Sequence, residues 1–417
     1  MPYVASVMRR KAVIWVPSVN GRELQDVIRR GRQWLYLRIL PRLPGRVERA
    51  IQNVLANVVL RGLRMRLGVA AVRRVLLVTN DLSRSGAPQL VYQMALLQKQ
   101  AGACPIVLSP LSGAMLADFE QAGIPVIVKP RPSVWEHVIP RMLPFLDAAI
   151  CNTVDTADAV RLLAPKVPTL WYLHEISLIE ERRASPNVRD AMTLAQRVWA
   201  GSPPCAEVIR ELRSDVEVVA YGLTPLPRSR RADGGRFRIG VFGSIERRKG
   251  QDLVVEALSL LSQEVSDGVE IAFFGRSLDV DLGQRLAMAA AENPSISFHQ
   301  ELDRAGYIEA MGNVDAVLVS SRDDTLPLVS LDALGMGRML LLAPTVGTKA
   351  WLEDGVDCLV GRATTAHGIA DLIARGWAVR DERERFARAA QAAFQAHFSL
   401  DRFKVRLDGV VKEMAGS

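Results

Sequence analysis

Two aspartates, Asp324 and Asp332, stand eight residues apart in the stretch 320–334. The pattern around them predicts a strand that ends where this stretch starts, then a polar loop, then a helix. Asp324 would lie in the loop and Asp332 about one turn into the helix, where free N–H groups of residues 325–329 would meet a phosphate. Carboxylates so placed suit hydrogen bonds from sugar or ribose hydroxyls better than the sharing of a proton. The alternative is that these acids only satisfy the helix dipole.

Three consecutive cations, Arg247, Arg248 and Lys249, stand between a strand-like run and a helix-like run. Cations at a helix N-terminus oppose the macrodipole, which prefers negative charge there. The arrangement becomes favourable when a diphosphate occupies the spot, and a broken local rule of this kind indicates function. A solvated charge cluster is the alternative interpretation.

A third loop, residues 79–88, also follows a strong strand and opens a helix. Gly86 in this loop permits close backbone approach, and the free N–H groups of the helix would face an anion. The loop is not G-x-G-x-x-G, and no G-x-x-x-x-G-K-[ST] occurs in the chain, which disfavours dinucleotide-fingerprint and P-loop proteins. A purely structural glycine is the alternative.

His174 and Glu175 directly follow the apolar run 169–173. A histidine at the carboxyl end of a parallel strand lies near the rim of a ligand cleft, although a lone histidine often has only a structural role. The other histidines and the four cysteines show no metal-ligand spacing. We therefore predict no metal site and no cofactor other than the substrate.

Positioning these motifs requires strands that alternate with helices, and the sequence shows that alternation twice. Strands are predicted at 74–79, 105–109, 125–128, 148–151, 169–173, 198–201 and 216–220, and again at 237–242, 270–274, 295–298, 316–320 and 339–342. Helices are predicted at 87–101, 203–212, 250–263, 280–292, 303–311, 328–337, 366–378, 382–396 and 400–415. The predicted fold class is α/β, with two Rossmann-like, doubly wound, parallel-sheet domains.

The expected domain boundaries follow from composition. Residues 222–235 are rich in Gly, Pro, Ser and Arg, as in a linker. The expected parts are a basic amphipathic extension (1–72), a first Rossmann-like domain (73–222), the linker (223–235), a second Rossmann-like domain (236–397) and a C-terminal helix (398–417).

The net charge of +8 in 417 residues is unevenly distributed. Residues 1–74 hold 16 Lys and Arg against 3 Asp and Glu, whereas the rest holds 37 against 42. This excludes a generally basic, nucleic-acid-binding body. No apolar run of about 18 residues predicts a spanning helix, and the N-terminus lacks the long apolar core of a signal peptide.

The basic N-terminal segment combines arginines with apolar residues. Residues 46–67 have the spacing of an amphipathic helix, and Trp34 and Tyr36 lie among arginines upstream. This composition suits an anionic lipid surface. An extension packed on the domain and a flexible tail are the alternatives.

In this order, the four motifs resemble the GT-B glycosyltransferases, specifically the large retaining family 4, which includes lipopolysaccharide, capsule and mannosyl transferases. The resemblance covers about residues 73–417 and is strongest over 237–360, in the stretches 241–252 and 320–337 and in the Glu-Asp-Gly of 353–355. The combination is much more specific than any one piece.

The resemblance implies that residues 73–222 form the acceptor domain, that 236–397 form the nucleotide-sugar donor domain, and that the helix of 398–417 crosses back to the first domain. It also implies roles for individual residues. The implied catalytic residues are Lys249, Arg248, Asp324 and His174, and the implied donor-binding residues are Gly86, Gly243, Arg247, Thr325, Leu326, Pro327, Leu328 and Asp332. Lys249 and a neighbouring arginine would neutralise the departing diphosphate. Asp324 would contact sugar hydroxyls, Asp332 the ribose, and His174 the region of the acceptor and transferred sugar.

The chain departs from the family pattern at several positions. Both acids of the pair are aspartates where the family has glutamates, so each is one methylene shorter. Ser244 replaces a frequent arginine, which shifts the cation role to residues 247–249. The extension 1–72 is not part of the pattern.

The predicted function is that of a retaining glycosyltransferase using a nucleotide-diphosphate sugar and a glycan or lipid-linked acceptor. The protein would be cytoplasmic, with its N-terminal segment a candidate for attachment to the inner face of the cytoplasmic membrane. Three alternatives remain: an inactive, sugar-binding or scaffolding subunit; another GT-B enzyme, such as an epimerase or phosphorylase; and an inverting transferase, for which Asp81 is a weak candidate base.

Overall fold

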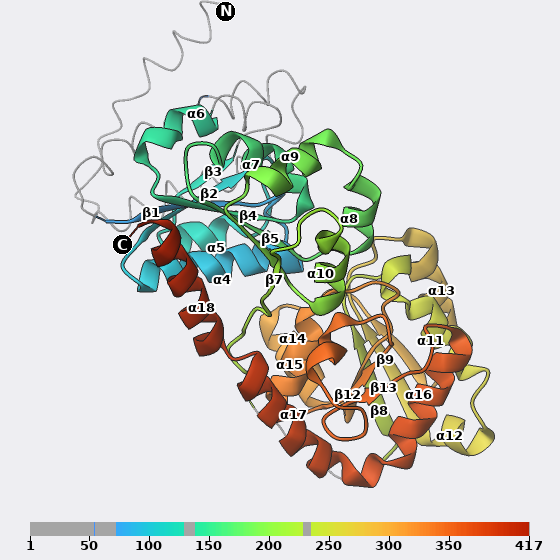
Figure 1. The fold of residues 1–417 in the computed structure, drawn as a ribbon. Helices are drawn as coiled ribbons and strands as arrows, with labels where there is room; N and C mark the ends of the chain where they lie inside the picture. The colour runs from blue at the N-terminus through green and yellow to red at the C-terminus, as the bar shows by residue number, and fades with distance from the viewer. Residues whose placement is uncertain (1–53, 55–71, 129–137, 228–234, 417) are drawn as a thin grey trace, which may run out of the picture.

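The computed structural model describes residues 54, 72–128, 138–227 and 235–416. The expected extension, including the helix expected at 46–67, lies outside the described residues, apart from positions 54 and 72, as does most of the linker. The two domains follow one another along the long axis of the molecule (Figure 1). The predicted fold class, two doubly wound parallel-sheet domains, is confirmed.

The first domain is built on seven parallel strands in the order β3-β2-β1-β4-β5-β6-β7. The strands are β1 (Arg74–Val78), β2 (Cys104–Ser109), β3 (Val126–Val128), β4 (Ala148–Asn152), β5 (Thr169–Leu173), β6 (Arg197–Ala200) and β7 (Glu217–Val218). The helices are α4 (Gly86–Gln100), α5 (Leu116–Gln121), α6 (Ile139–Met142), α7 (Ala157–Leu163), α8 (Ser177–Arg182), α9 (Pro186–Leu194) and α10 (Pro203–Arg210).

The second domain is built on six parallel strands in the order β10-β9-β8-β11-β12-β13. The strands are β8 (Phe237–Phe242), β9 (Val269–Phe274), β10 (Ile296–His299), β11 (Ala316–Val319), β12 (Met339–Leu342) and β13 (Leu359–Val360). The helices are α11 (Gln251–Leu258), α12 (Gln263–Gly268), α13 (Val280–Glu292), α14 (Arg304–Gly312), α15 (Leu328–Met336), α16 (Ala366–Ala378), α17 (Arg383–His397) and α18 (Leu400–Met414).

Most elements that were expected with stated bounds agree within one or two residues, but two differ, and one strand was not expected. The helix expected at 250–263 is wrong: α11 ends at Leu258, and α12 starts separately because the Ser262 hydroxyl accepts a hydrogen bond from the Val265 N–H. The strand expected at 216–220 pairs over only two residues. The short edge strand β13 was not expected from the sequence.

The first sheet is buried on both faces, as its unbroken apolar strands require. Leu76 and Val78 of β1 face one apolar cluster, and Val75 and Leu77 face another, which continues into the second domain. This shared core makes the two domains one packed unit.

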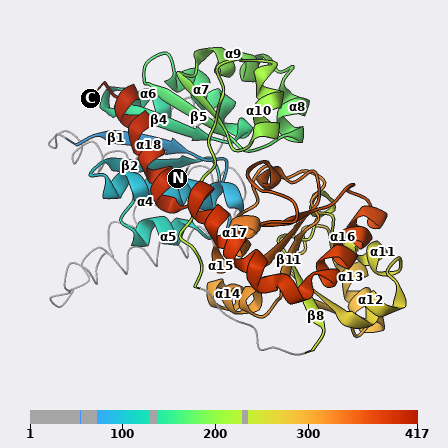
Figure 2. The ribbon, with the colours of Figure 1, turned by 60° about the horizontal axis from the view of Figure 1, so that its bottom comes forward.

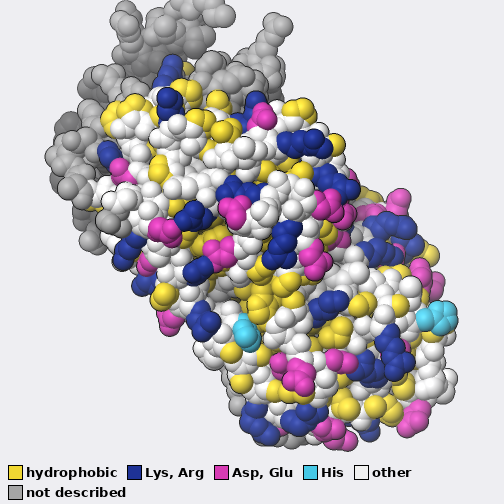
Figure 3. Space-filling view, in the orientation of Figure 1, with side chains coloured by type: hydrophobic (Ala, Val, Ile, Leu, Met, Phe, Trp, Pro, Cys, Tyr) yellow, Lys and Arg dark blue, Asp and Glu magenta, His cyan; other side chains and the backbone are white. Residues whose placement is uncertain are grey.

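Two chain crossings connect the domains and lie against each other. Leu223 N–H donates to Phe398 O at 2.9 Å, and Leu400 N–H donates to Leu223 O at 3.0 Å. Beyond that point α18 lies across the first domain, where Phe403 stacks near Tyr172 with ring centroids 6.3 Å apart (Figures 1 and 2). On the face drawn in Figure 3, basic and acidic side chains are interspersed over both domains.

Candidate donor-binding and active site

Each sheet reverses its strand order at one point, between β1 and β4 in the first domain and between β8 and β11 in the second. Ligands of open parallel sheets bind outside the carboxyl ends of strands at such switch points. The loops of Gly86, Lys249 and Asp324 follow β1, β8 and β11, and His174 follows β5, next to β4. The four sequence motifs therefore all lie at strand ends beside a switch point.

The cationic loop and the first acid of the pair meet directly. Lys249 Nζ lies 2.5 Å from Asp324 Oδ2, and Arg248 lies 3.8 Å from the same oxygen. The two paired side chains are only 19% and 11% exposed. Ser321 Oγ adds a hydrogen bond to Asp324 at 3.1 Å. The structure thus brings together three of the four expected catalytic residues.

A second ion pair fixes this loop. Arg322 makes two 2.7 Å hydrogen bonds to Asp252, and its backbone N–H donates to Arg248 O at 2.8 Å. Gly250 has φ +72°, and a Cβ there would lie 2.2 Å from Ser320 O. Only glycine allows this approach, so residue 250 sets how close the cations lie to the loop after β11.

Asp332 lies in a different network. Its Oδ2 accepts a hydrogen bond from Tyr307 Oη at 2.9 Å, and Arg304 lies 3.9 Å away. Burial raises the pKa of Asp332 to about 6, against the opposing effects of Arg304 and Tyr307. The two acids of the pair therefore have unlike surroundings, one ion-paired and one buried beside a phenol.

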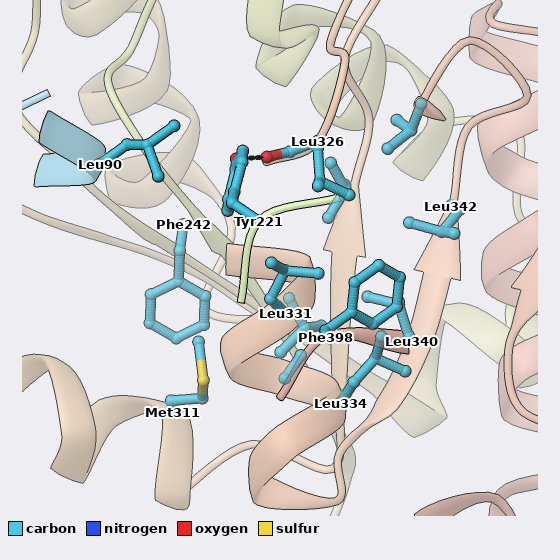
Figure 4. Close-up of a cluster of buried hydrophobic side chains, with 14 of the residues drawn as sticks. Leu90, Tyr221, Phe242, Met311, Leu326, Leu331, Leu334, Leu340, Leu342 and Phe398 are labelled. Carbon is cyan, nitrogen blue, oxygen red and sulfur yellow. Dashed lines mark hydrogen bonds between the residues drawn. The ribbon is translucent and has the colours of Figure 1, made fainter. Parts of the chain in front are cut away.

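The residues between the two acids lead into α15. Thr325 is buried, and its Oγ1 has no hydrogen-bond partner among the described residues. Leu326 O accepts the hydroxyl of Tyr221, a residue of the chain leaving the first domain (Figure 4). Pro327 is the N-cap residue of α15. The Leu328 side chain packs against Gly86 of the first domain, where a Cβ added to the glycine would lie 3.8 Å from Leu328 Cδ1. The N-termini of α4 and α15 thus lie close together.

In the first domain, His174 is held by Asn152. The His174 Nε2 and Asn152 Oδ1 atoms are 2.5 Å apart, and Asn152 Nδ2 donates to Ala87 O at 3.1 Å. Burial lowers the pKa of His174 to about 3, so the ring is neutral at pH 7. Burial also raises the pKa of Glu175 to about 7, although the N–H groups of His174 and Val154 donate to its carboxylate.

Sequence reasoning missed four residues of this region: Asn152, Gly201, Tyr221 and Tyr307. Asn152 had a signal, since it is a polar residue directly after an expected strand. Tyr221 likewise follows the strand expected at 216–220, and Gly201 ends the strand expected at 198–201, but the segments that they contact are distant in the chain. Tyr307 had no signal.

The remaining expected residues have less contact with the rest of the site. Gly243 has φ +133°, a conformation that favours glycine. Arg247 is exposed, and its guanidinium has no partner within the described part of the chain. Asp81 accepts the Ser83 N–H at 2.7 Å and so shapes its own loop. No cluster of three or more metal-ligating side chains occurs among the residues described.

Comparison with known proteins shows what the second domain is similar to. Residues 236–378 match the family model "Glycosyl transferases group 1". A glycogen synthase of Rhodopseudomonas palustris is 30% identical over 140 residues, which are 33% of this chain and 27% of that protein. The chain thus aligns with only about a quarter of this relative's length.

Solved structures match over most of the chain. HepE of Anabaena, in complex with UDP and glucose, has a TM-score of 0.68 at 20% identity, covering 81% of this chain and 99% of HepE. Sucrose-phosphate synthase of Thermosynechococcus elongatus has a TM-score of 0.67 at 14% identity, covering 83% and 100%. Both likenesses show the GT-B fold. The described chain therefore has the GT-B fold, and its residues 236–378 are similar to the group 1 glycosyltransferases.

Proposed function

We propose that this protein is a retaining glycosyltransferase that takes a hexose-type sugar from a nucleotide-diphosphate donor and joins it to a hydroxyl of a glycan or lipid-linked acceptor. The observation that carries this proposal is the meeting of Lys249, Arg248 and Asp324 beside the facing N-termini of α4 and α15. Two helix N-termini and a pair of cations suit a diphosphate. The HepE complex with UDP-glucose supports a nucleotide-sugar donor.

In the proposed reaction, the acceptor hydroxyl oxygen forms a bond to the anomeric carbon on the face from which the phosphate leaves. The bond from that carbon to the phosphate oxygen breaks, and the hydroxyl proton passes to the departing phosphate. Lys249 and Arg248 stabilise the negative charge that develops there. Asp324, freed from Lys249 as the phosphate takes its place, accepts hydrogen bonds from sugar hydroxyls.

A screen of UDP-, ADP- and GDP-linked sugars by thermal shift tests the proposal, followed by chromatography of the nucleotide released. A donor at 100 times its Kd stabilises the folded protein by about 2.7 kcal/mol, so the correct donor raises Tm with dose. Absence of any stabilising nucleotide sugar would count against the assignment.

A second candidate is a sugar-binding or scaffolding subunit without activity. The hydrogen bond from Tyr307 to Asp332 favours an inactive subunit, because the carboxylate expected to bind the ribose already has a partner within the protein. Calorimetry separates the candidates: a scaffold that keeps the site binds the nucleotide sugar without releasing the nucleotide, and one that has lost the site binds none.

We further propose that the basic segment of residues 1–72 attaches the protein to the anionic face of the cytoplasmic membrane, where a lipid-linked acceptor is available. The charge of this segment supports the idea. No helix in the described ranges is long and apolar enough to cross a membrane. The full chain should cosediment with anionic but not neutral liposomes, and replacing Arg46, Arg49, Arg61, Arg64 and Arg66 by glutamine should weaken this. Equal binding to neutral liposomes would contradict an electrostatic attachment.

A further inference from the structure

Asn152 connects two loops of the candidate site. It is the last residue of β4, and its side chain is fully buried. The amide nitrogen donates to Ala87 O at the start of α4, and the amide oxygen faces His174 Nε2 after β5. One side chain thus fixes the histidine relative to the first turn of α4.

These two contacts determine where the histidine hydrogen lies. A backbone carbonyl only accepts hydrogen bonds, so the Asn152 nitrogen must face Ala87 O. The oxygen then faces His174, and at 2.5 Å the Nε2 atom must carry the hydrogen. Since the ring is neutral, Nδ1 has no hydrogen and presents a lone pair.

The Nδ1 atom of His174 lies where the first domain meets the second. His174 Nδ1 is inaccessible to solvent and lacks a hydrogen-bond partner among the described residues. A Cβ on Gly201 would lie 3.1 Å from it and 3.2 Å from Thr325 Cγ2. Thr325 Oγ1 of the second domain also has no partner within the described ranges. Buried polar atoms are rarely left unsatisfied, so the partner of Nδ1 comes from outside the protein, as a water or a ligand hydroxyl.

The backbone after Asn152 is strained in a way that supports a functional role. Thr153 has φ +75°, which β-branched residues rarely adopt. Hydrogen bonds hold it there: its N–H donates to Tyr172 O at 3.0 Å, and its carbonyl accepts from Trp171 Nε1 and Thr156 Oγ1 at 2.8 Å each. Such strain gathers at functional sites.

We propose that Asn152 is a positioning residue that holds His174 in the tautomer with hydrogen on Nε2, and so presents Nδ1 as an acceptor for a hydroxyl group bound between the domains. The identity of that hydroxyl as one of the donor sugar rests on the proposed function, whereas the tautomer does not.

Long-range proton–nitrogen NMR of the full chain labelled with ¹⁵N-histidine tests the tautomer, with His174→Gln used to assign the signals. In the wild type, Nε2 should be protonated and Nδ1 unprotonated. Asn152→Asp keeps an oxygen beside Nε2 and should keep this pattern, whereas Asn152→Leu should give a mixture or move the hydrogen to Nδ1. Hydrogen on Nδ1 in the wild type, or an unchanged pattern in Asn152→Leu, would overturn the proposal. Asn152→Ala takes the place of the leucine variant if that one does not fold.

Adding UDP-glucose to the wild type tests the hydroxyl contact. The Nδ1 resonance should move toward the position of a hydrogen-bonded acceptor, and Asn152→Leu should lower kcat/KM by about tenfold to a hundredfold. UDP-glucose that binds, as shown by a raised Tm, without moving the Nδ1 signal refutes the contact. Failure of every nucleotide sugar to bind refutes the proposed function and leaves the tautomer result standing.

Discussion

At the switch point of the second domain the meeting side chains are charged, whereas at that of the first domain they are neutral. Lys249, Arg248 and Asp324 form an ion cluster, while Asn152 and His174 form one hydrogen bond between uncharged groups. Charged groups suit a diphosphate, whose charge grows as the bond to the sugar breaks. Neutral donors and acceptors suit hydroxyl groups. A neutral acceptor such as His174 Nδ1 binds only a hydroxyl whose hydrogen points toward it. Under the proposed function, we expect the charged cluster of the second domain to supply most of the rate and the neutral pair of the first domain to supply selectivity.

The largest effect is expected from Lys249→Ala. Removing the cation that is 2.5 Å from Asp324 should lower kcat by about 10²–10³-fold, because phosphate charge is then less stabilised. The increase of donor KM with NaCl, caused by screening, should also become weaker. Nucleotide release measured at several salt concentrations checks both. Lys166→Ala, at an exposed position, is the control, and equal activity of the two variants would remove Lys249 from the site.

His174→Phe should have a smaller effect of a different kind. Phenylalanine keeps the ring packed against Tyr172 and Tyr221 but loses the acceptor, so kcat/KM should fall by about tenfold. The salt dependence of donor KM should stay as in the wild type, because no charge is removed. His367→Phe on the exposed start of α16 is the control. A changed salt dependence in His174→Phe would break the comparison between the domains.

Asp332→Asn should change how stability depends on pH. The pKa of Asp332 is about 6 in the folded state and near the usual 3.8 in the unfolded state. Between these pH values the carboxyl group is protonated in the folded protein and ionised in the unfolded chain. The contribution of this proton to the free energy of unfolding is therefore fully present below pH 3.8 and is lost as pH rises through 6. Between pH 5 and 8 the free energy of unfolding should fall by about 1 kcal/mol. Urea unfolding at these pH values should show this loss in the wild type but not in the variant. Identical slopes would mean that Asp332 is ionised throughout.

The smallest effect is expected at the contact between the domains. Ser177 of α8 donates from its N–H and Oγ to Asp323 Oδ2 of the second domain, at 3.1 and 2.5 Å, in an exposed position. Ser177→Ala keeps the hydrogen bond from the backbone N–H and loses the one from Oγ, which is worth about 0.5–1 kcal/mol. Donor KM should therefore rise about two- to fivefold, with kcat unchanged. Ser214→Ala, exposed and away from the cleft, is the control. A larger loss in kcat than in KM would show that this serine does more than join the domains.

How far the sequence predicted the site differs between the two domains. In the second domain, the cations 247–249 and Asp324 were expected, since each stands in a polar loop after an apolar strand. In the first domain, His174 was expected but Asn152 and Tyr221 were not, and in the second domain Tyr307 was missed. Charge is visible in a sequence, whereas a neutral hydrogen bond becomes significant only through its partner.

The sequence by itself determined the order of strands and helices, because apolar runs must be buried and their ends must carry loops. It also determined which polar loops lie at strand ends. Only the tertiary structure decided which loops meet, since neighbouring parallel strands join residues such as Asn152 and His174 from segments apart in the chain. It also decided the charge states, because burial keeps His174 neutral and raises the pKa of Asp332. Local pattern fixes the elements, while contacts between distant segments and the loss of water fix their chemistry.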